Sequence, residues 1–191
     1  VLDKTVDYLR TNHPEHFLIA DAKRGDIGNT AKMYARSLFS TFDFDAVTIS
    51  PYMGSETVTP FLEYPGRYAI VVALSSNSSS ADFQTALKDG KPLYRVVMER
   101  MMEISTPENM MFVVGATKAD KLKEIRQFCP DNFFLVPGVG AQGGSAEEVM
   151  SNGANDKGGL LINSSRGVLY ASAGEDFAQA AALSAAATAR F

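Results

Sequence analysis

The chain has one cysteine, Cys129, in 191 residues, so no disulfide can form within it and a reducing compartment is expected. It has no apolar run near the roughly 20 residues that a membrane-spanning helix needs. Tracts of lysine or arginine are also absent, and the formal net charge is -4, which argues against a nucleic-acid or membrane-surface role. These absences predict a cytoplasmic protein with no nucleic-acid or membrane partner.

What the sequence does contain is a regular alternation of strand-like and helix-like segments. Six apolar runs read as strands: Phe17–Ala20, Ala46–Ser50, Tyr68–Leu74, Met110–Gly115, Phe133–Pro137 and Leu160–Asn163. Helical candidates lie near 28–42, 54–63, 91–105, 118–128, 144–153 and 174–190. Nearly continuous apolar strands that alternate with amphipathic helices favour a parallel α/β sheet.

Polar and glycine-rich residues gather after the strand ends, which suits either a doubly wound sheet or a (β/α)8 barrel. A barrel usually has eight units and about 250 residues, so six units fall short of one. A further helix at 1–12, which would follow an absent strand, makes a barrel without its first two strands the better fit. We predict an α/β chain whose residues 1–191 form a single (β/α)8 TIM barrel domain, truncated at the N-terminus, with about six βα units present.

The most informative segment runs from Asp21 to Thr30 and reads DAKRGDIGNT. It places two carboxylates and an ammonium, those of Asp21, Asp26 and Lys23, after the apolar run Phe17–Ala20, which we expect to be buried. In a regular strand Asp21 and Lys23 point to the same face, because side chains alternate. Charges at the rim of an apolar interior are costly, and they usually serve chemistry rather than a surface ion-pair cluster.

A second group of signals indicates phosphate binding. The run Pro137–Gly144 leaves a strand and enters a helix, where glycines allow close approach and free N–H groups attract an anion. One strand later, Arg166 can donate two parallel hydrogen bonds to phosphate oxygens. A lone glycine-rich turn or a lone arginine would be weak evidence. Their occurrence after consecutive strands, where barrels commonly bind phosphate, favours a functional site.

With these residues in view, the chain resembles the orotidine 5'-monophosphate decarboxylase family, in particular its longer bacterial form. The resemblance covers essentially the whole chain. Three elements carry it: Asp21-x-Lys23-x-x-Asp26-Ile27-x-x-Thr30, the run Pro137–Gly144, and Arg166-Gly167. It implies a carboxy-lyase of de novo pyrimidine synthesis that converts orotidine 5'-monophosphate to uridine 5'-monophosphate with no metal or organic cofactor.

The resemblance also implies roles for individual residues. Lys23 matches the proton donor to the carbanion, and Asp21 matches the carboxylate close to that of the substrate. Ser76 would contact the pyrimidine, with Ser75 as the alternative if the loop alignment slips by one. The phosphate ligands would be Gln142, Arg166 and the backbone of Gly167.

The family is a homodimer, so the resemblance implies that Asp26 and Thr30, accompanied by Ile27, reach the partner's site near the ribose. The family also uses an aspartate and a lysine at the ends of its first two strands, and this sequence contains neither strand. Two alternatives therefore stay open. One is a sugar-phosphate decarboxylase or synthase on the same barrel, which uses a magnesium ion, and the other is a catalytically silent fragment that binds nucleotide phosphate.

Overall fold

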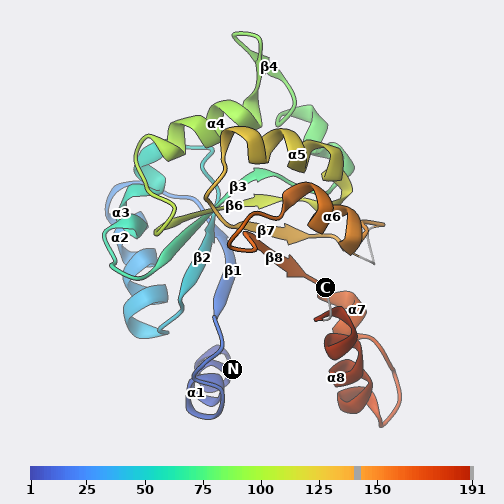
Figure 1. Ribbon diagram of the computed structural model, residues 1–191. Helices are drawn as coiled ribbons and strands as arrows, with labels where there is room; N and C mark the ends of the chain where they lie inside the picture. The colour runs from blue at the N-terminus through green and yellow to red at the C-terminus, as the bar shows by residue number, and fades with distance from the viewer. Residues whose placement is uncertain (140–142, 190–191) are drawn as a thin grey trace. The chain divides into compact units, whose positions relative to one another are not determined.

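We describe a computed structural model of the chain, which covers residues 1–139 and 143–189 (Figure 1). The strands are β1 (Ile19–Arg24), β2 (Ala46–Ile49), β3 (Tyr68–Leu74), β4 (Leu87–Lys88), β5 (Lys91–Pro92), β6 (Met110–Val114), β7 (Phe134–Pro137) and β8 (Leu160–Asn163). The α-helices are α1 (Leu2–Asn12), α2 (Gly28–Arg36), α3 (Thr59–Leu62), α4 (Leu93–Met102), α5 (Ala119–Phe128), α6 (Ala146–Gly153), α7 (Arg166–Leu169) and α8 (Phe177–Thr188).

Six strands hydrogen-bond in the order β1-β2-β3-β6-β7-β8, while β4 and β5 form a separate antiparallel hairpin. The pairs β1–β2, β2–β3 and β7–β8 are parallel. Every residue of β2 and of β6 is buried, as expected for parallel strands that are covered on both faces. The predicted α/β class, with parallel strands alternating with helices, is confirmed.

By its contacts the chain divides into two compact units, which we describe separately. The first unit comprises 1–72 and 96–112 and contains α1, β1, α2, β2 and α3. Four charged side chains tie its loops together. The Asp45 carboxylate accepts from Arg10 at 2.9 Å, from Arg67 at 3.2 Å and from the Leu18 N–H at 2.7 Å. These bonds fix the start of β1 against the start of β2, and Arg67 also pairs with Asp43 at 2.5 Å.

The second unit comprises 73–95 and 113–191. Its helices α5 and α6 lie side by side, and α7 packs next to α8 (Figure 1). The hairpin of β4 and β5 also belongs to this unit. Helix α8 has no buried residue, and its Phe177 and Leu183 side chains are 61% and 65% exposed, so one apolar surface of this unit is uncovered in the described chain.

The elements match the predicted ranges closely, with four differences. The predicted helix 28–42 ends as an α-helix at Arg36 and continues as a π-helix over Ser37–Thr41. The predicted helix 54–63 divides into a 3-10 turn, Ser55–Thr57, and α3. Neither the β4–β5 hairpin nor α7 was predicted, because each is too short to show a periodic pattern.

The fourth difference concerns β1, which begins at Ile19 and continues to Arg24 instead of ending at Ala20. Phe17 is 43% exposed and, of the four apolar residues expected to be buried, only Ala20 is. The expectation that this whole run is buried was therefore wrong. Asp21 and Lys23 lie within the strand rather than after it, whereas Asp26 follows it. Within 1–139 and 143–189, no helix has the length and apolar character needed to cross a bilayer.

Candidate functional site

The first unit brings Asp21 and Lys23 together at the carboxyl end of β1. Lys23 Nζ donates to Asp21 Oδ1 at 2.5 Å, and the two side chains are 57% and 63% exposed. An ammonium and a carboxylate thus form a pair that is open to a ligand. Such a pair can stabilise a developing negative charge or deliver a proton.

The pair does not arise from the regular alternation that we expected. Ala20 lies opposite Val47 and Arg24 lies opposite Ile49, so three residues of β1 face only Thr48 of β2. Lys23 has a φ of 45°, in the left-handed region that residues with a Cβ seldom adopt. A bulge with a left-handed residue therefore re-aims the side chains. Asp21 and Lys23 therefore meet because of the bulge and not because of regular alternation.

Thr48 is a residue of the site that the sequence analysis missed. Its side chain is fully buried, and its hydroxyl bonds both the Lys23 backbone N–H and Asp21 Oδ1, each at 2.9 Å. The signal available in the sequence was a hydroxyl within the otherwise apolar strand Ala46–Ile49. Buried hydroxyls are normally hydrogen-bonded, so its position in the strand suggested a partner nearby.

Asp26, Ile27 and Thr30 lie where β1 passes into α2. Asp26 Oδ1 accepts from the Ile27 N–H at 2.8 Å, which fixes the carboxylate locally. Ile27 is 47% exposed and Thr30 is also exposed, so these side chains face outward from the first unit. Within the described residues Lys23 pairs with Asp21 and not with Asp26.

In the second unit, the serines after β3 are held by a network. The Ser75 N–H donates to Gln84 Oε1 at 2.8 Å, and the Ser75 hydroxyl donates to Asn77 Oδ1 at 2.7 Å. The Ser76 carbonyl accepts from the Thr117 hydroxyl at 2.9 Å. The Ser75 hydroxyl is thus used within the loop, whereas the Ser76 backbone is fixed by the segment that follows β6.

The predicted phosphate loop leaves β7 and enters α6, as the sequence indicated. Gly138 and Gly143 have φ values of 99° and 88°, and the Gly144 N–H donates to the Gly138 carbonyl at 3.2 Å. Gln142 lies outside the described residues. Arg166 and Gly167 begin α7 after β8, and both are exposed. The Ser184 hydroxyl donates to the Gly167 carbonyl at 3.0 Å, which ties this short helix to α8.

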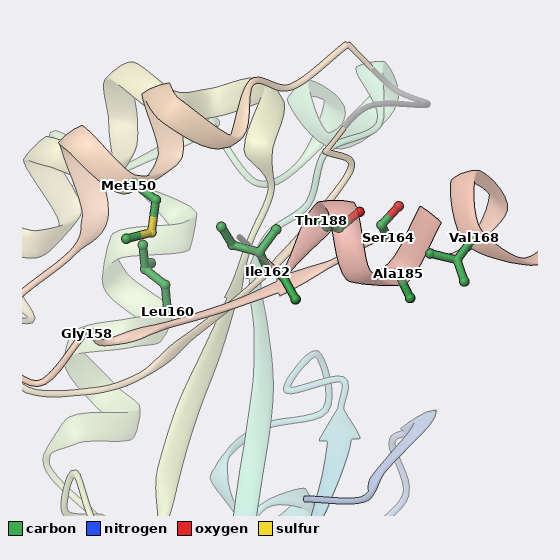
Figure 2. Close-up of a pocket in the computed structure, with 9 residues that line it drawn as sticks. Met150, Gly158, Leu160, Ile162, Ser164, Val168, Ala185 and Thr188 are labelled. Atoms are coloured by element: carbon green, nitrogen blue, oxygen red, sulfur yellow. The ribbon is translucent and has the colours of Figure 1, made fainter. Parts of the chain in front are cut away.

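Two cavities in the second unit do not suit a phosphate. One, of about 460 Å³, lies between β8 and α8 and has no charged side chain in its lining (Figure 2). Its lining residues are Met150, Gly158, Leu160, Ile162, Ser164, Val168, Ala185, Thr188 and Ala189. The other, of about 620 Å³, includes the carboxylates of Asp120 and Glu148, which repel anions. Gly143 and Gly144 of the predicted phosphate loop also line this second cavity, and phosphate binding by that loop stays a prediction.

One group of described side chains has the geometry to hold a metal ion. Ligand atoms of His13, Glu15 and His16 lie within 4.8 Å of one another in the loop between α1 and β1. His16 Nδ1 is 2.9 Å from Glu15 Oε1. This loop precedes β1, whereas Asp21 and Lys23 lie near the strand's other end, so the group is separate from the charged pair.

Comparison with known proteins independently supports the family resemblance. A family model described as "Orotidine 5'-phosphate decarboxylase / HUMPS family" matches residues 3–181. Orotidine 5'-phosphate decarboxylase of Flavobacterium johnsoniae is 52% identical over 180 residues, which cover 94% of this chain and 66% of that protein. The same-named protein of Porphyromonas gingivalis is 50% identical over 189 residues, covering 98% and 68%.

Solved structures give the same result for the fold. Leishmania donovani OMP decarboxylase matches with a TM-score of 0.77 and 37% identity, over 90% of this chain and 66% of that one. Leishmania donovani UMP synthase matches with a TM-score of 0.84 and 36% identity, over 98% and 41%. These matches confirm the predicted (β/α) barrel class, with six of its strands in this chain. The chain spans 66% of the length of the first curated relative.

Proposed function

Because this chain belongs to the orotidine 5'-phosphate decarboxylase / HUMPS family, we propose that it is a carboxy-lyase that converts orotidine 5'-monophosphate to uridine 5'-monophosphate. The observation that carries the proposal is the exposed pair of Lys23 and Asp21, whose side chains are 2.5 Å apart at the end of β1. The names of the relatives that are about half identical support the same substrate. We further propose that the reaction is cofactor-free.

Lys23 supplies the central chemistry of the proposed reaction. Loss of carbon dioxide leaves an electron pair on a ring carbon that no carbonyl group can delocalise well. An ammonium about 4 Å away stabilises that charge by about 4 kcal/mol at an effective dielectric of 20. That is a large part of the ~8–23 kcal/mol that enzymes typically supply. Lys23 then donates its proton to the carbanion, which completes the product.

Asp21 holds the Lys23 ammonium where the reacting carbon will lie. Since Asp21 Oδ1 accepts from Nζ, the lysine's three rotatable donors are restricted before the substrate arrives. A group that is oriented in advance does not have to reorganise during the reaction. The exposure of both side chains leaves room for the substrate's carboxylate on the same side.

The phosphate end of the substrate is assigned to the second unit. Arg166 would pair with the phosphate, with the Gly167 backbone and Gln142 beside it. Ser76 would contact the pyrimidine, and Ser75, whose hydroxyl bonds Asn77, is the alternative. Contacts far from the reacting carbon can lower the barrier when their full strength is reached only in the transition state.

The chain would act as a homodimer in which Asp26 and Thr30 contribute to the partner's site. Four apolar side chains of the first unit support an interface near these residues. Ile27, Met33, Tyr52 and Met53 are 47%, 47%, 83% and 48% exposed. Burial of such side chains against a second copy is favourable. Two further predictions stay as they were made. One is a cytoplasmic location, and the other is that residues 1–191 belong to a single barrel domain.

The alternative within the family is a sugar-phosphate decarboxylase or synthase that needs a magnesium ion. It predicts loss of activity in a chelator, whereas the proposed reaction continues there. The second alternative, a silent fragment that binds nucleotide phosphate, predicts binding of uridine 5'-monophosphate without turnover of the decarboxylase substrate. Turnover of orotidine 5'-monophosphate that survives a chelator supports the proposed reaction. If there is no turnover, a binding measurement with uridine 5'-monophosphate distinguishes the silent fragment from the sugar-phosphate enzyme.

The direct test is the Lys23→Ala variant in an assay of carbon dioxide release. We expect nearly complete loss of activity, because the proton donor is removed. The circular dichroism spectrum should not change, because the Lys23 side chain is exposed and contributes little to packing. Lys121→Ala is the matched control, since Lys121 is also exposed and pairs with Glu124 at 3.1 Å. Substantial activity in Lys23→Ala, or equal loss in both variants, would refute the assignment.

A further inference from the structure

The bulge in β1 depends on a single side chain of the neighbouring strand. Regular pairing between β1 and β2 stops after Ala20 and Val47 and resumes at Arg24 and Ile49. Where the regular hydrogen bonding between the strands is interrupted, backbone N–H groups of β1 lose their usual carbonyl acceptors. The Lys23 N–H instead donates to the Thr48 hydroxyl at 2.9 Å. Thr48 thus supplies by its side chain the acceptor that a regular strand supplies by its backbone.

The same hydroxyl also orients the carboxylate of the charged pair. Thr48 Oγ1 donates its single proton to Asp21 Oδ1 at 2.9 Å, and a longer contact of 3.4 Å reaches the Ala20 carbonyl. Asp21 Oδ1 is also the oxygen that accepts from Lys23 Nζ. One buried hydroxyl is therefore bonded to the backbone of Lys23 and to the carboxylate that pairs with its side chain.

Packing alone does not explain a threonine at this position. Ala46, Val47 and Ile49 are apolar and fully buried, and a valine would fill the same volume as Thr48. A fully buried hydroxyl is unfavourable unless it is hydrogen-bonded. The bonds to Asp21 and Lys23 satisfy it, and both partners belong to the candidate active site.

We propose that Thr48 is a positioning residue of the active site, which holds Lys23 in its left-handed conformation and fixes Asp21 beside it. The inference deepens the proposed function and rests on it. Thr48 itself touches neither substrate nor reacting atoms. It acts by keeping the ammonium aimed at one point, and small losses of alignment in such groups have large effects on rate.

The test compares Thr48→Val, which removes only the hydroxyl, with Thr48→Ser, which keeps it. We expect Thr48→Val to lower kcat by roughly tenfold to a hundredfold, since the Lys23 N–H loses its acceptor and Asp21 loses the hydroxyl that orients it. KM for orotidine 5'-monophosphate should change little, because phosphate and pyrimidine contacts lie elsewhere. Thr48→Ser should restore most of kcat. A general loss of packing would not be rescued by serine, which lacks the methyl group.

Thr57→Val is the matched control. Thr57 is also fully buried in the first unit, and its hydroxyl donates to the Gly54 carbonyl at 2.8 Å, outside the Asp21–Lys23 pair. We expect it to lower stability while kcat is retained. A wild-type kcat in Thr48→Val, or a Thr48→Ser variant as impaired as Thr48→Val, would overturn the inference.

A second measurement separates this inference from the proposed function. Hydrogen exchange of the Lys23 amide needs no substrate, and we expect it to be faster in Thr48→Val than in wild type or Thr57→Val. If the wild-type protein does not decarboxylate the nucleotide, the proposed function fails while faster exchange still supports the positioning role. Unchanged exchange of that amide in Thr48→Val would overturn the positioning role whatever the activity.

Discussion

Arg126 shows how one side chain can organise several loops. Its guanidinium donates to the carbonyls of Gly153, Cys129, Pro130, Asn132 and Gly159 at 2.8–3.1 Å. It also lies 3.8 Å from the centroid of the Phe134 ring. Burial lowers the pKa of Arg126, yet the five carbonyls compensate the desolvated charge. The ends of α5 and α6 and the start of β8 are thereby joined.

We expect Arg126→Lys to lower the free energy of unfolding by about 2–4 kcal/mol, because an ammonium cannot reproduce a planar fork with five donors. Urea denaturation measures this. Arg100→Lys is the control, since Arg100 and its partner Glu103 are 55% and 63% exposed, and it should change stability by less than about 0.5 kcal/mol. Equal effects of the two substitutions would contradict this account.

Cys129 gives a pH-dependent prediction. Burial raises the pKa of its thiol from 9.0 to about 12, although the nearby Arg126 cation acts in the opposite direction. Above about pH 9 the unfolded chain releases the thiol proton while the folded chain keeps it, so stability present below pH 9 is lost as the pH rises toward 12. The slope from one such group is at most about 1.4 kcal/mol per pH unit.

Cys129→Ala should therefore lose stability less steeply than wild type between pH 9 and 11 in urea titrations. Burial also raises the pKa of Tyr94, which contributes in the same direction in both proteins. The difference between the two slopes thus isolates the thiol. Parallel slopes would show that Cys129 titrates normally in the folded chain. Because burial raises the pKa of Cys129, its thiol stays protonated near neutral pH.

Among single residues, the sequence predicted charged side chains more readily than their partners. Asp21 and Lys23 were recognised because charges are rare after an apolar run. Thr48 was missed, since its importance depends on a bulge in the neighbouring strand that no pattern within Ala46–Ile49 reveals. Arg126 was also missed, because its role likewise depends on other parts of the chain. Its carbonyl partners extend to Gly153 and Gly159, which are distant along the chain.

At the scale of elements, strands made mostly of apolar residues were predicted better than the strand that carries charges. The ranges of β3 and β8 agree with prediction, because apolar residues fill each strand and polar residues bound it. The start and end of β1 were wrong, since a strand that carries charges and a bulge loses the alternation on which recognition depends. The glycine-rich connection from β7 to α6 was predicted correctly, because its residue types are required by the backbone itself.

The segments that directly follow β3 and β6 approach each other closely. A Cβ on Gly115 would lie 2.6 Å from Ser76 N and Cα, closer than real contacts permit. Gly115→Ala should therefore displace the serine loop, raise KM for orotidine 5'-monophosphate, and lower kcat/KM by roughly tenfold or more. Steady-state kinetics check this.

Gly153→Ala is the control for the glycine substitution. A Cβ there would lie 3.1 Å from the far end of Leu160, a flexible side chain that can move. Alanine also favours the helical conformation more than glycine does. The kinetics of the Gly153→Ala variant should therefore match those of wild type. If Gly115→Ala has wild-type kinetics as well, Ser76 is not set by that close approach, and its assignment to the pyrimidine loses support.

For the whole molecule, the sequence predicted the class of fold but not the assembly of the site. The candidate residues divide between the two units, with Asp21, Lys23, Asp26 and Thr30 in one and Ser76 and Arg166 in the other. Local patterns carry no information on which distant segments act together, so the assignment of these residues to one site stays a prediction. The chain also spans only 66% of the Flavobacterium johnsoniae relative. The resemblance to a family therefore supplied what local patterns lacked.

The proposed dimer makes a prediction that concerns two chains at once. If Asp26 serves the partner's site while Lys23 serves its own, Lys23→Ala and Asp26→Ala proteins are each inactive, but a mixed dimer contains one intact site. Random pairing makes about half of the dimers mixed, so roughly a quarter of wild-type activity should return after the two proteins are co-refolded. Carbon dioxide release measures the recovery.

The control pairs Lys23→Ala with Asp21→Ala. Asp21 and Lys23 are bonded within one chain, so no exchange of subunits can place both intact groups in one site, and activity should stay absent. Recovery of activity in both mixtures would mean that it does not arise from the exchange of subunits, and the test would not support a contribution of Asp26 to the partner's site. Recovery in neither would mean that Asp26 acts within its own chain. In that case the position of Asp26 between β1 and α2 would need another explanation, such as contact with a substrate bound to the same subunit.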